Sequence, residues 1–149
     1  MFGQRSAARS FGRNLKDSLG RESVNISAPD LAGRRVLLVE DESLIVMLFE
    51  DTLTEMGCEI AGVASRFDDA IRKASALNFD VAILDVNLNN LRTFPIAEII
   101  KSRNIPFVFA TGYGATSIPE GLSGVPVLQK PFTAPELERG LRTALAAKR

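Results

Sequence analysis

Residues 80–86, DVAILDV, are apolar at every position except Asp80 and Asp85. An apolar run of this length, rich in β-branched side chains, is typical of a parallel strand that is covered on both faces. Similar short runs occur on both sides of it along the chain, at residues 36–40, 58–65, 106–113 and 125–132. We therefore expect five strands, of which residues 80–86 form the third.

Segments with helical periodicity alternate with these strands. We expect helices over residues 44–57, 66–78, 94–104 and 135–149. Gly57 is well placed to end the first helix, and Ser65, with Asp68 three residues later, is expected to cap the second. Thr133 and Glu136 have the spacing of a capping box at the start of the last helix.

The weakest helix candidate is residues 112–124, GYGATSIPEGLSG, between the fourth and fifth strands. Four glycines and a proline disfavour a helix there, so it should be short and loose. The alternation of strands and helices nevertheless predicts an α/β protein with a doubly wound, five-stranded parallel sheet built from five βα units.

The composition excludes several kinds of chemistry. Histidine is absent, so the chain has no Ser-His-Asp triad, no His-assisted cysteine nucleophile, no His-containing zinc site and no phosphohistidine. The single cysteine, Cys58, lies among apolar residues, and we interpret it as a core residue in a reducing, cytoplasmic setting. No apolar run reaches the roughly 18 residues of a membrane helix, so we expect no membrane span.

The first part of the chain differs in charge from the rest. Residues 1–35 carry seven basic and three acidic side chains, whereas the remainder carries eleven and fifteen. Basic and apolar residues recur there every three or four positions, namely Arg5, Arg9, Arg13 and Lys16, and Phe11, Leu15 and Leu19. We interpret residues 1–33 as a basic N-terminal arm with a linker over 21–33, and residues 34–149 as the folded domain.

Several interpretations of the arm stay open. It could be a partly disordered basic segment, or an amphipathic helix that docks on a partner. Docking on a second copy would make a homodimer. Contact with a membrane or a nucleic acid is a further alternative.

Polar residues follow the predicted strands at their carboxyl ends. Glu40 and Asp41 follow the first strand, Asp85 the third, Thr111 the fourth and Lys130 the fifth. Ligand sites in doubly wound sheets form at that edge, so these side chains should meet. Clustered carboxylates need a cation, and Mg²⁺ suits oxygen ligands. A carboxylate held there can attack a phosphoryl group, whose oxygens the ion, a lysine and a hydroxyl would stabilise.

Each of these residues has a simpler interpretation when it is considered alone. Asp85 could cap a helix, and the acidic run 40–42 could be a solvated turn. Thr111 could be an ordinary strand residue and Lys130 an ordinary surface lysine. Their joint position at the ends of four strands favours a common site.

Four segments, VLLVEDE, AILDVNL, FVFATGY and VLQKPF, together resemble the response-regulator receiver domain of two-component signalling. The resemblance covers roughly residues 34–146 and implies a flavodoxin-like strand order of 2-1-3-4-5. It also implies a cis Lys130–Pro131 peptide bond. By this resemblance Glu42 lies just outside the site.

The resemblance also implies a role for each site residue. Asp85 would be the phosphoacceptor and Asp41 a direct Mg²⁺ ligand, with Glu40 acting through a water and Asn87 binding through its backbone carbonyl. Thr111 would bind a phosphoryl oxygen and Lys130 would pair with the phosphate.

Two departures from the family pattern concern the switch. Val127 occupies the fifth-strand position where receivers usually carry Tyr or Phe, and the only tyrosine is Tyr113. These features resemble the subfamily named for its Phe-Ala-Thr-Gly-x-Tyr motif, which is associated with kinases of the HWE and HisKA2 types. Tyr113 could shield the phosphoryl group, pack on the fourth helix as a substitute switch, or be a surface aromatic.

We expect a single-domain response regulator that accepts a phosphoryl group from a sensor histidine kinase or a histidine phosphotransfer protein. It would promote only its own phosphorylation and dephosphorylation, and would not bind DNA through the receiver.

The output could take one of three forms. It could be contact with a downstream protein through the fourth helix, fifth strand and fifth helix, or it could be a phosphorelay step or a phosphate sink. The alternative is a pseudo-receiver that binds partners without phosphorylation. Phosphatase-type and flavodoxin interpretations fit the first strand less well.

Overall fold

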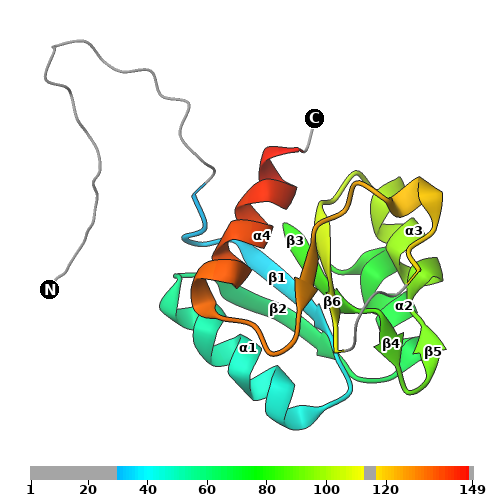
Figure 1. The fold of residues 1–149 in the computed structure, drawn as a ribbon, viewed down its shortest axis with the longest axis horizontal. Helices are drawn as coiled ribbons and strands as arrows, with labels where there is room; N and C mark the ends of the chain where they lie inside the picture. Colours follow the sequence, from blue (N-terminus) through cyan, green and yellow to red (C-terminus); the bar gives the residue numbers. More distant parts are fainter. Residues whose placement is uncertain (1–29, 113–116, 148–149) are drawn as a thin grey trace, which may run out of the picture.

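The computed structural model describes residues 30–112 and 117–147. Its main sheet has five strands, which are β1 (Arg35–Val39), β2 (Glu59–Ala64), β3 (Val81–Asp85), β6 (Phe107–Thr111) and β7 (Val127–Gln129). All neighbouring strands are parallel, in the order β2-β1-β3-β6-β7. Counted along the chain, this is the order 2-1-3-4-5, which confirms the predicted fold (Figure 1).

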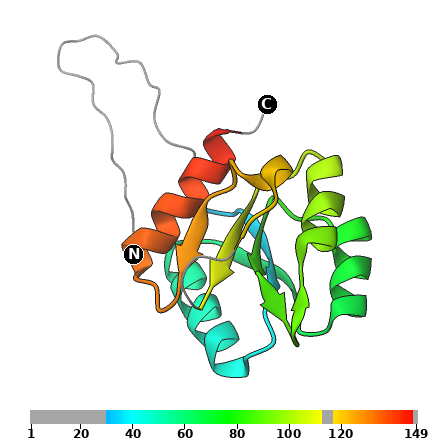
Figure 2. The same ribbon diagram turned by 45° about the vertical axis from the view of Figure 1, so that its right-hand side comes forward.

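Four helices cover the two faces of the sheet, namely α1 (Ser43–Glu55), α2 (Phe67–Ala76), α3 (Phe94–Ser102) and α4 (Ala134–Ala146). Helices α1 and α4 lie on one face, and α2 and α3 on the other (Figures 1 and 2). Strand β3 contributes Val81 and Ile83 to the core under α1 and α4. It contributes Ala82 and Leu84 to the core under α2 and α3. This double burial explains why residues 80–86 are almost wholly apolar.

The predicted fourth helix is reduced to a single 3-10 turn, η1 (Glu120–Leu122), within the described residues of that segment. Pro119 precedes this turn, Gly121 lies within it and Gly124 follows it, so extension of the turn into a longer helix is disfavoured. Leu122 anchors this turn, because its side chain is buried in the core under α2 and α3.

The capping predictions had different outcomes. Thr133 and Glu136 form the expected capping box of α4, with each side chain accepting a hydrogen bond from the other residue's backbone N–H. The prediction for Ser65 was wrong, because α2 begins at Phe67 with Arg66 at its N-cap and no side-chain capping bond. The backbone carbonyl of Ser65 instead accepts a hydrogen bond from the side chain of Asn89.

A short antiparallel hairpin follows β3 and was not predicted. It consists of β4 (Asn87–Leu88) and β5 (Leu91–Arg92), joined by Asn89 and Asn90. Both asparagines have positive φ, 50° and 67°, which is the backbone conformation that tight two-residue hairpin turns require. The hairpin lies at the carboxyl edge of the sheet, next to the end of β3 (Figure 1).

The packed chain begins earlier than the predicted boundary at residue 34. Leu31, assigned to the linker from the sequence, is only 2% exposed and belongs to the core under α1 and α4. Gly33 donates its N–H to the carbonyl of Gly57 at 2.7 Å, which fixes this segment beside the end of α1. The rest of the predicted arm, residues 1–29, lies outside the described residues.

Within residues 30–112 and 117–147, no helix is both long enough and apolar enough to cross a bilayer.

Candidate functional site

The predicted site residues surround a cleft of about 440 Å³ at the carboxyl edge of the sheet. Polar and charged side chains dominate its lining, which consists of Asp41, Glu42, Asp85, Asn87, Asn89, Asn90, Thr111, Gly112 and Lys130. These residues come from the ends of β1, β3 and β6, from the hairpin, and from the residue after β7. The topology therefore gathers them as the strand-end pattern predicts.

Lys130 is the cationic centre of this cluster. Its ammonium Nζ lies 2.7 Å from Glu40 Oε1 and 3.2 Å from Asp85 Oδ2. The three side chains are only 11%, 1% and 9% exposed, respectively. The peptide bond between Lys130 and Pro131 is cis, as the resemblance implied.

Burial shifts the protonation equilibria of these groups. Burial raises the pKa of Glu40 to about 7, and the nearby charge of Asp85 also raises it, although the bond from Lys130 opposes the shift. Burial likewise raises the pKa of Asp85, against the charge of Lys130 and the backbone N–H of Asn87. Burial alone would lower the pKa of Lys130, but its bond to Glu40 and the charge of Asp85 outweigh burial and raise it. One ammonium therefore serves two buried carboxylates, which leaves negative charge uncompensated.

Backbone hydrogen bonds fix the orientation of the three carboxylates. The N–H of Glu42 donates to Glu40 Oε2, and that of Asn87 donates to Asp85 Oδ1, both at 3.1 Å. The N–H of Asn89, at the hairpin tip, donates to Asp41 Oδ2 at 3.3 Å. The hairpin thus contributes directly to the site.

A residue missed in the sequence, Thr93, holds the backbone under Asp85. Its hydroxyl is fully buried and donates to the carbonyl of Asp85 at 2.7 Å. The sequence shows only a threonine before a helix, so nothing pointed to this contact. The role of Asn89 was detectable, since an Asn-Asn pair between two short apolar segments indicates a tight hairpin turn.

The carboxylates fit a divalent metal ion. One oxygen each from Glu40, Asp41 and Asp85 lies within 4.8 Å of the others. Asp41 is the most exposed of the three, and Asp41 and Asp85 both line the cleft. Hard oxygen donors that leave room for water on one side are the ligands that Mg²⁺ prefers.

The remaining predicted residues are distributed differently. Thr111 ends β6, is 8% exposed and lines the cleft. Val127 is 51% exposed at the start of β7 and lines a cavity against α4 instead. Tyr113 lies outside the described residues. Glu42 was expected outside the site, but it lines the cleft with Oε1 4.0 Å from Lys130 Nζ, because the chain turns there into α1.

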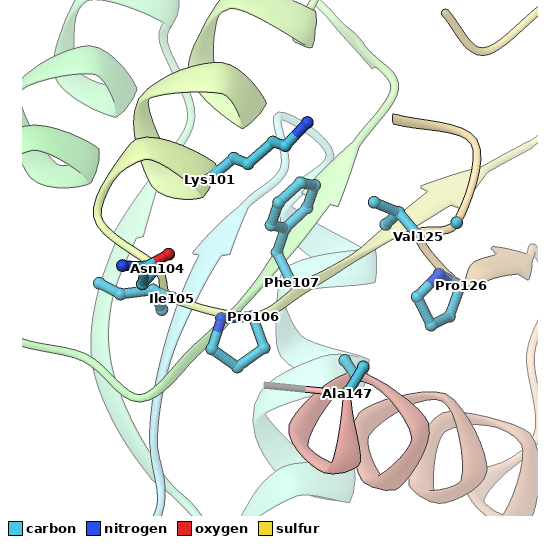
Figure 3. A pocket seen from close by; sticks show the side chains of 10 residues that line it. Lys101, Asn104, Ile105, Pro106, Phe107, Val125, Pro126 and Ala147 are labelled. Atoms are coloured by element: carbon cyan, nitrogen blue, oxygen red, sulfur yellow. The ribbon is translucent and has the colours of Figure 1, made fainter. Parts of the chain in front are cut away.

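A second cavity, of about 250 Å³, lies at the opposite, amino edge of the sheet. Ile105, Pro106, Val125 and Pro126 line it together with the end of α4 (Figure 3). Its one cationic side chain, Lys101, donates a hydrogen bond to the carbonyl of Gly121 at 2.8 Å. The cavity lacks convergent charged groups, so the carboxyl-edge cleft is the better candidate site.

Comparison with known proteins identifies the class. Residues 36–142 match the model of the response regulator receiver domain, and the chain belongs to this family of two-component signalling proteins.

Several individual proteins are also similar to this chain. It is 38% identical to SdrG from Sphingomonas melonis Fr1, whose solution structure superposes with a TM-score of 0.69 and covers 77% of this chain and 98% of that one. It is 32% identical over 117 residues to the transcriptional regulatory protein PdtaR of Mycobacterium tuberculosis, covering 76% of this chain and 57% of PdtaR. The phyllosphere-induced regulator PhyR of Methylorubrum extorquens is 32% identical over 104 residues, covering 68% of this chain and 37% of PhyR. The chain therefore spans about half the length of these curated relatives, or less.

Proposed function

We propose that this protein is a response regulator that accepts a phosphoryl group on Asp85. The observation that carries the proposal is the position of the Asp85 carboxylate, which lines the cleft between the ammonium of Lys130 and the carboxylates of Glu40 and Asp41. A related observation comes from SdrG, which is 38% identical and has also been solved in a BeF3-activated conformation with a TM-score of 0.64.

The proposed reaction is the transfer of a phosphoryl group to a carboxylate. A carboxylate oxygen of Asp85 forms a bond to phosphorus while the P–N bond of a partner's phosphohistidine breaks, and the imidazole leaves with its electron pair. Asp85 needs no base, because its nucleophilic form carries no proton. Lys130, already 3.2 Å from Asp85, would pair with the phosphoryl oxygens, and the Thr111 hydroxyl would bind one of them.

Asp41, Asp85 and the carbonyl of Asn87 would hold Mg²⁺, with Glu40 acting through a water. When bound, the ion supplies positive charge against the phosphoryl oxygens. Beyond this phosphorylation and its reversal by water we assign the chain no enzymatic activity. We place this exchange in the cytoplasm.

The partners follow from the same proposal. The donor would be a sensor histidine kinase or a histidine phosphotransfer protein, with the HWE and HisKA2 kinases as the first to test. The subfamily motif supports this choice through Phe109, Ala110, Thr111 and Gly112, although Tyr113 follows the glycine directly, without the intervening residue. Val127 in place of an aromatic is a second supporting feature.

Output would be contact with a downstream protein over β7, α4 and the segment before β7. Phosphorylation would shift a pre-existing equilibrium of this surface, with Thr111 and Tyr113 in place of the usual Thr and aromatic pair. Phosphorelay or phosphate-sink roles use the same chemistry and differ only in where the phosphoryl group goes next.

The test uses acetyl phosphate as a small donor, with the full chain and Mg²⁺, and intact-protein mass spectrometry as the measurement. We expect a gain of one phosphoryl group that Asp85→Asn abolishes and that a metal chelator prevents. Asp51→Asn, which replaces an exposed aspartate on α1, is the matched control and should still be labelled. Labelling of Asp85→Asn would show that the acceptor lies elsewhere, and no labelling of the wild type would support the pseudo-receiver.

A further inference from the structure

Asp41 has less support from hydrogen bonds than the other two carboxylates of the cluster. Glu40 and Asp85 each accept a bond from Lys130 and a second bond from a backbone N–H two residues further along. Within residues 30–112 and 117–147, the Asp41 carboxylate accepts one hydrogen bond, from the backbone N–H of Asn89 at 3.3 Å. That donor lies 48 positions away in the sequence. The orientation of Asp41 therefore depends on where the hairpin turn lies.

The hairpin is packed against the core on one side only. Leu88, in β4, is fully buried in the core under α2 and α3. Asn90, Leu91 and Arg92 are exposed, and Leu91 lines a hollow of about 470 Å³ between the hairpin and the start of α2. Packing therefore fixes the entry to the turn, whereas the turn itself needs polar contacts to stay in place.

The side chain of Asn89 supplies such a contact. Its Nδ2 donates a hydrogen bond to the backbone carbonyl of Ser65 at 2.9 Å. Ser65 directly follows Ala64, whose carbonyl accepts a bond from the N–H of Glu40 at 3.0 Å, and Glu40 directly precedes Asp41. A closed ring of hydrogen bonds therefore runs from Asp41 through the turn and the end of β2 back to the end of β1. Asn89 closes this ring with both its backbone and its side chain.

The residue type at position 89 meets two requirements at once. Its φ of 50° lies in the left-handed region, which asparagine adopts more readily than most other residues except glycine. Glycine would adopt the same φ but has no amide to donate to Ser65. The substitution Asn89→Gly therefore removes the side-chain bond without straining the turn.

We propose that Asn89 is a positioning residue that sets the Mg²⁺ affinity of the site through Asp41. Its side-chain amide fixes the turn on Ser65, and its backbone N–H then holds the Asp41 carboxylate in one orientation. Hydrogen bonds that orient a metal ligand before the ion arrives strengthen binding. This role rests on the proposed function, in which Asp41 binds the ion directly. Asn89 itself acts on the ion only through Asp41.

The experiment measures the dissociation constant of Mg²⁺ for the full chain without a phosphoryl donor, from the shifts of backbone amide signals during a Mg²⁺ titration. Asn89→Gly should weaken Mg²⁺ binding about tenfold. Asn90→Gly introduces the same backbone freedom at the other turn residue, which also has a positive φ, and should weaken binding clearly less. Asn104→Gly, at a φ of 60° on the amino edge of the sheet, is the matched control and should leave the affinity unchanged.

The rate of labelling by acetyl phosphate provides a second measurement. At limiting Mg²⁺ the rate of Asn89→Gly should fall below that of the wild type, and at saturating Mg²⁺ it should recover, because the variant lacks affinity rather than a reacting group. A rate that stays low at saturating Mg²⁺ would overturn the proposed role. Unchanged Mg²⁺ affinity in Asn89→Gly, or an equal loss in Asn90→Gly, would also overturn it.

Asp41→Asn separates this role from the proposed function. It should weaken Mg²⁺ binding more than Asn89→Gly does, because it alters the ligand itself. If Asp41→Asn left the affinity unchanged, the assignment of Asp41 as a metal ligand would fail, and the role of Asn89 with it. If Asp41→Asn weakened binding and Asn89→Gly did not, only the role of Asn89 would fail.

Discussion

The amino and carboxyl edges of the sheet bury different kinds of side chain, apolar at one edge and charged at the other. At the amino edge, Leu31, Cys58 and Phe79 close the core with apolar atoms and are 2%, 6% and 7% exposed. At the carboxyl edge, Glu40 and Asp85 are equally buried but carry charge around Lys130. Burying apolar surface stabilises a fold, whereas burying charge costs desolvation that an ion pair only partly offsets. The amino edge therefore stabilises the domain, whereas the buried charges of the carboxyl edge lower its stability.

The largest expected effect is at the amino edge. Leu31→Ala should lower the free energy of unfolding by about 2–5 kcal/mol, because it leaves a cavity in the core under α1 and α4. Chemical denaturation measures this, and labelling by acetyl phosphate should persist in the folded fraction. Leu91→Ala, at a 50% exposed position on β5, is the matched control and should change little. A small effect at Leu31 would mean that this segment is not anchored in solution.

The second-largest effect is expected at Glu40, whose burial at the carboxyl edge costs stability when the carboxylate is ionised. The pKa of Glu40 is raised from 4.5 to about 7 in the fold, so its contribution is fully present below pH 4.5 and is lost as pH rises through 7. Without metal, the free energy of unfolding of the wild type should therefore fall as the pH rises from 5 to 8, while that of Glu40→Gln should not show this fall. The loss in the wild type, relative to the variant, should be on the order of 2–3 kcal/mol. Denaturant titrations with a chelator check this.

Mg²⁺ and a surface variant provide two controls for the effect at Glu40. Adding Mg²⁺ should reduce the loss, since cation binding favours the ionised carboxylates. Glu55→Gln, on the exposed side of α1, should follow the wild type across the same pH range. If the difference in unfolding free energy between wild type and Glu40→Gln did not change with pH, the raised pKa of Glu40 would be contradicted.

A smaller effect is expected beneath Asp85. Thr93→Val keeps the side-chain shape but removes the hydroxyl that donates to the Asp85 carbonyl, and should cost about 1–3 kcal/mol. Thr93→Ser retains the hydroxyl and should recover most of that loss. Thermal or urea unfolding measures both variants. Equal losses in the two variants would show that the methyl group, rather than the hydrogen bond, matters.

The smallest effect is expected at Val127, which belongs to neither edge. Val127→Tyr introduces the aromatic that receivers usually carry, at a position that is 51% exposed. Stability should change by no more than about 0.5 kcal/mol, because the new side chain meets solvent rather than core. A clear destabilisation would indicate that the cavity between β7 and α4 is already closed in solution.

The sheet and most of the site could be predicted because both are encoded locally. Each strand is a short apolar run, and Asp85, Thr111 and Lys130 stand at or directly after the end of such a run. The capping box of Thr133 and Glu136 is likewise a property of four consecutive residues.

The features that were missed depend on contacts distant in the sequence or on a shift of one residue. Leu31 is a lone apolar residue whose burial depends on Cys58, 27 positions later. The hydroxyl of Thr93 acquires its role only through the carbonyl of Asp85, eight positions earlier. The misplaced cap at Ser65 came from a helix start displaced by one residue, which sequence patterns resolve poorly.

The ion cluster around Lys130 also has a consequence for ion selectivity. When Glu40, Asp41, Asp85 and Lys130 are all ionised, three negative charges face one positive charge, and Glu42 adds a fourth carboxylate in the cleft lining. Lys130 compensates only one of these charges, so a divalent cation would remove more of the remaining negative charge than one sodium or potassium ion would. Charge alone would therefore favour a divalent cation before the size of the cleft plays any part.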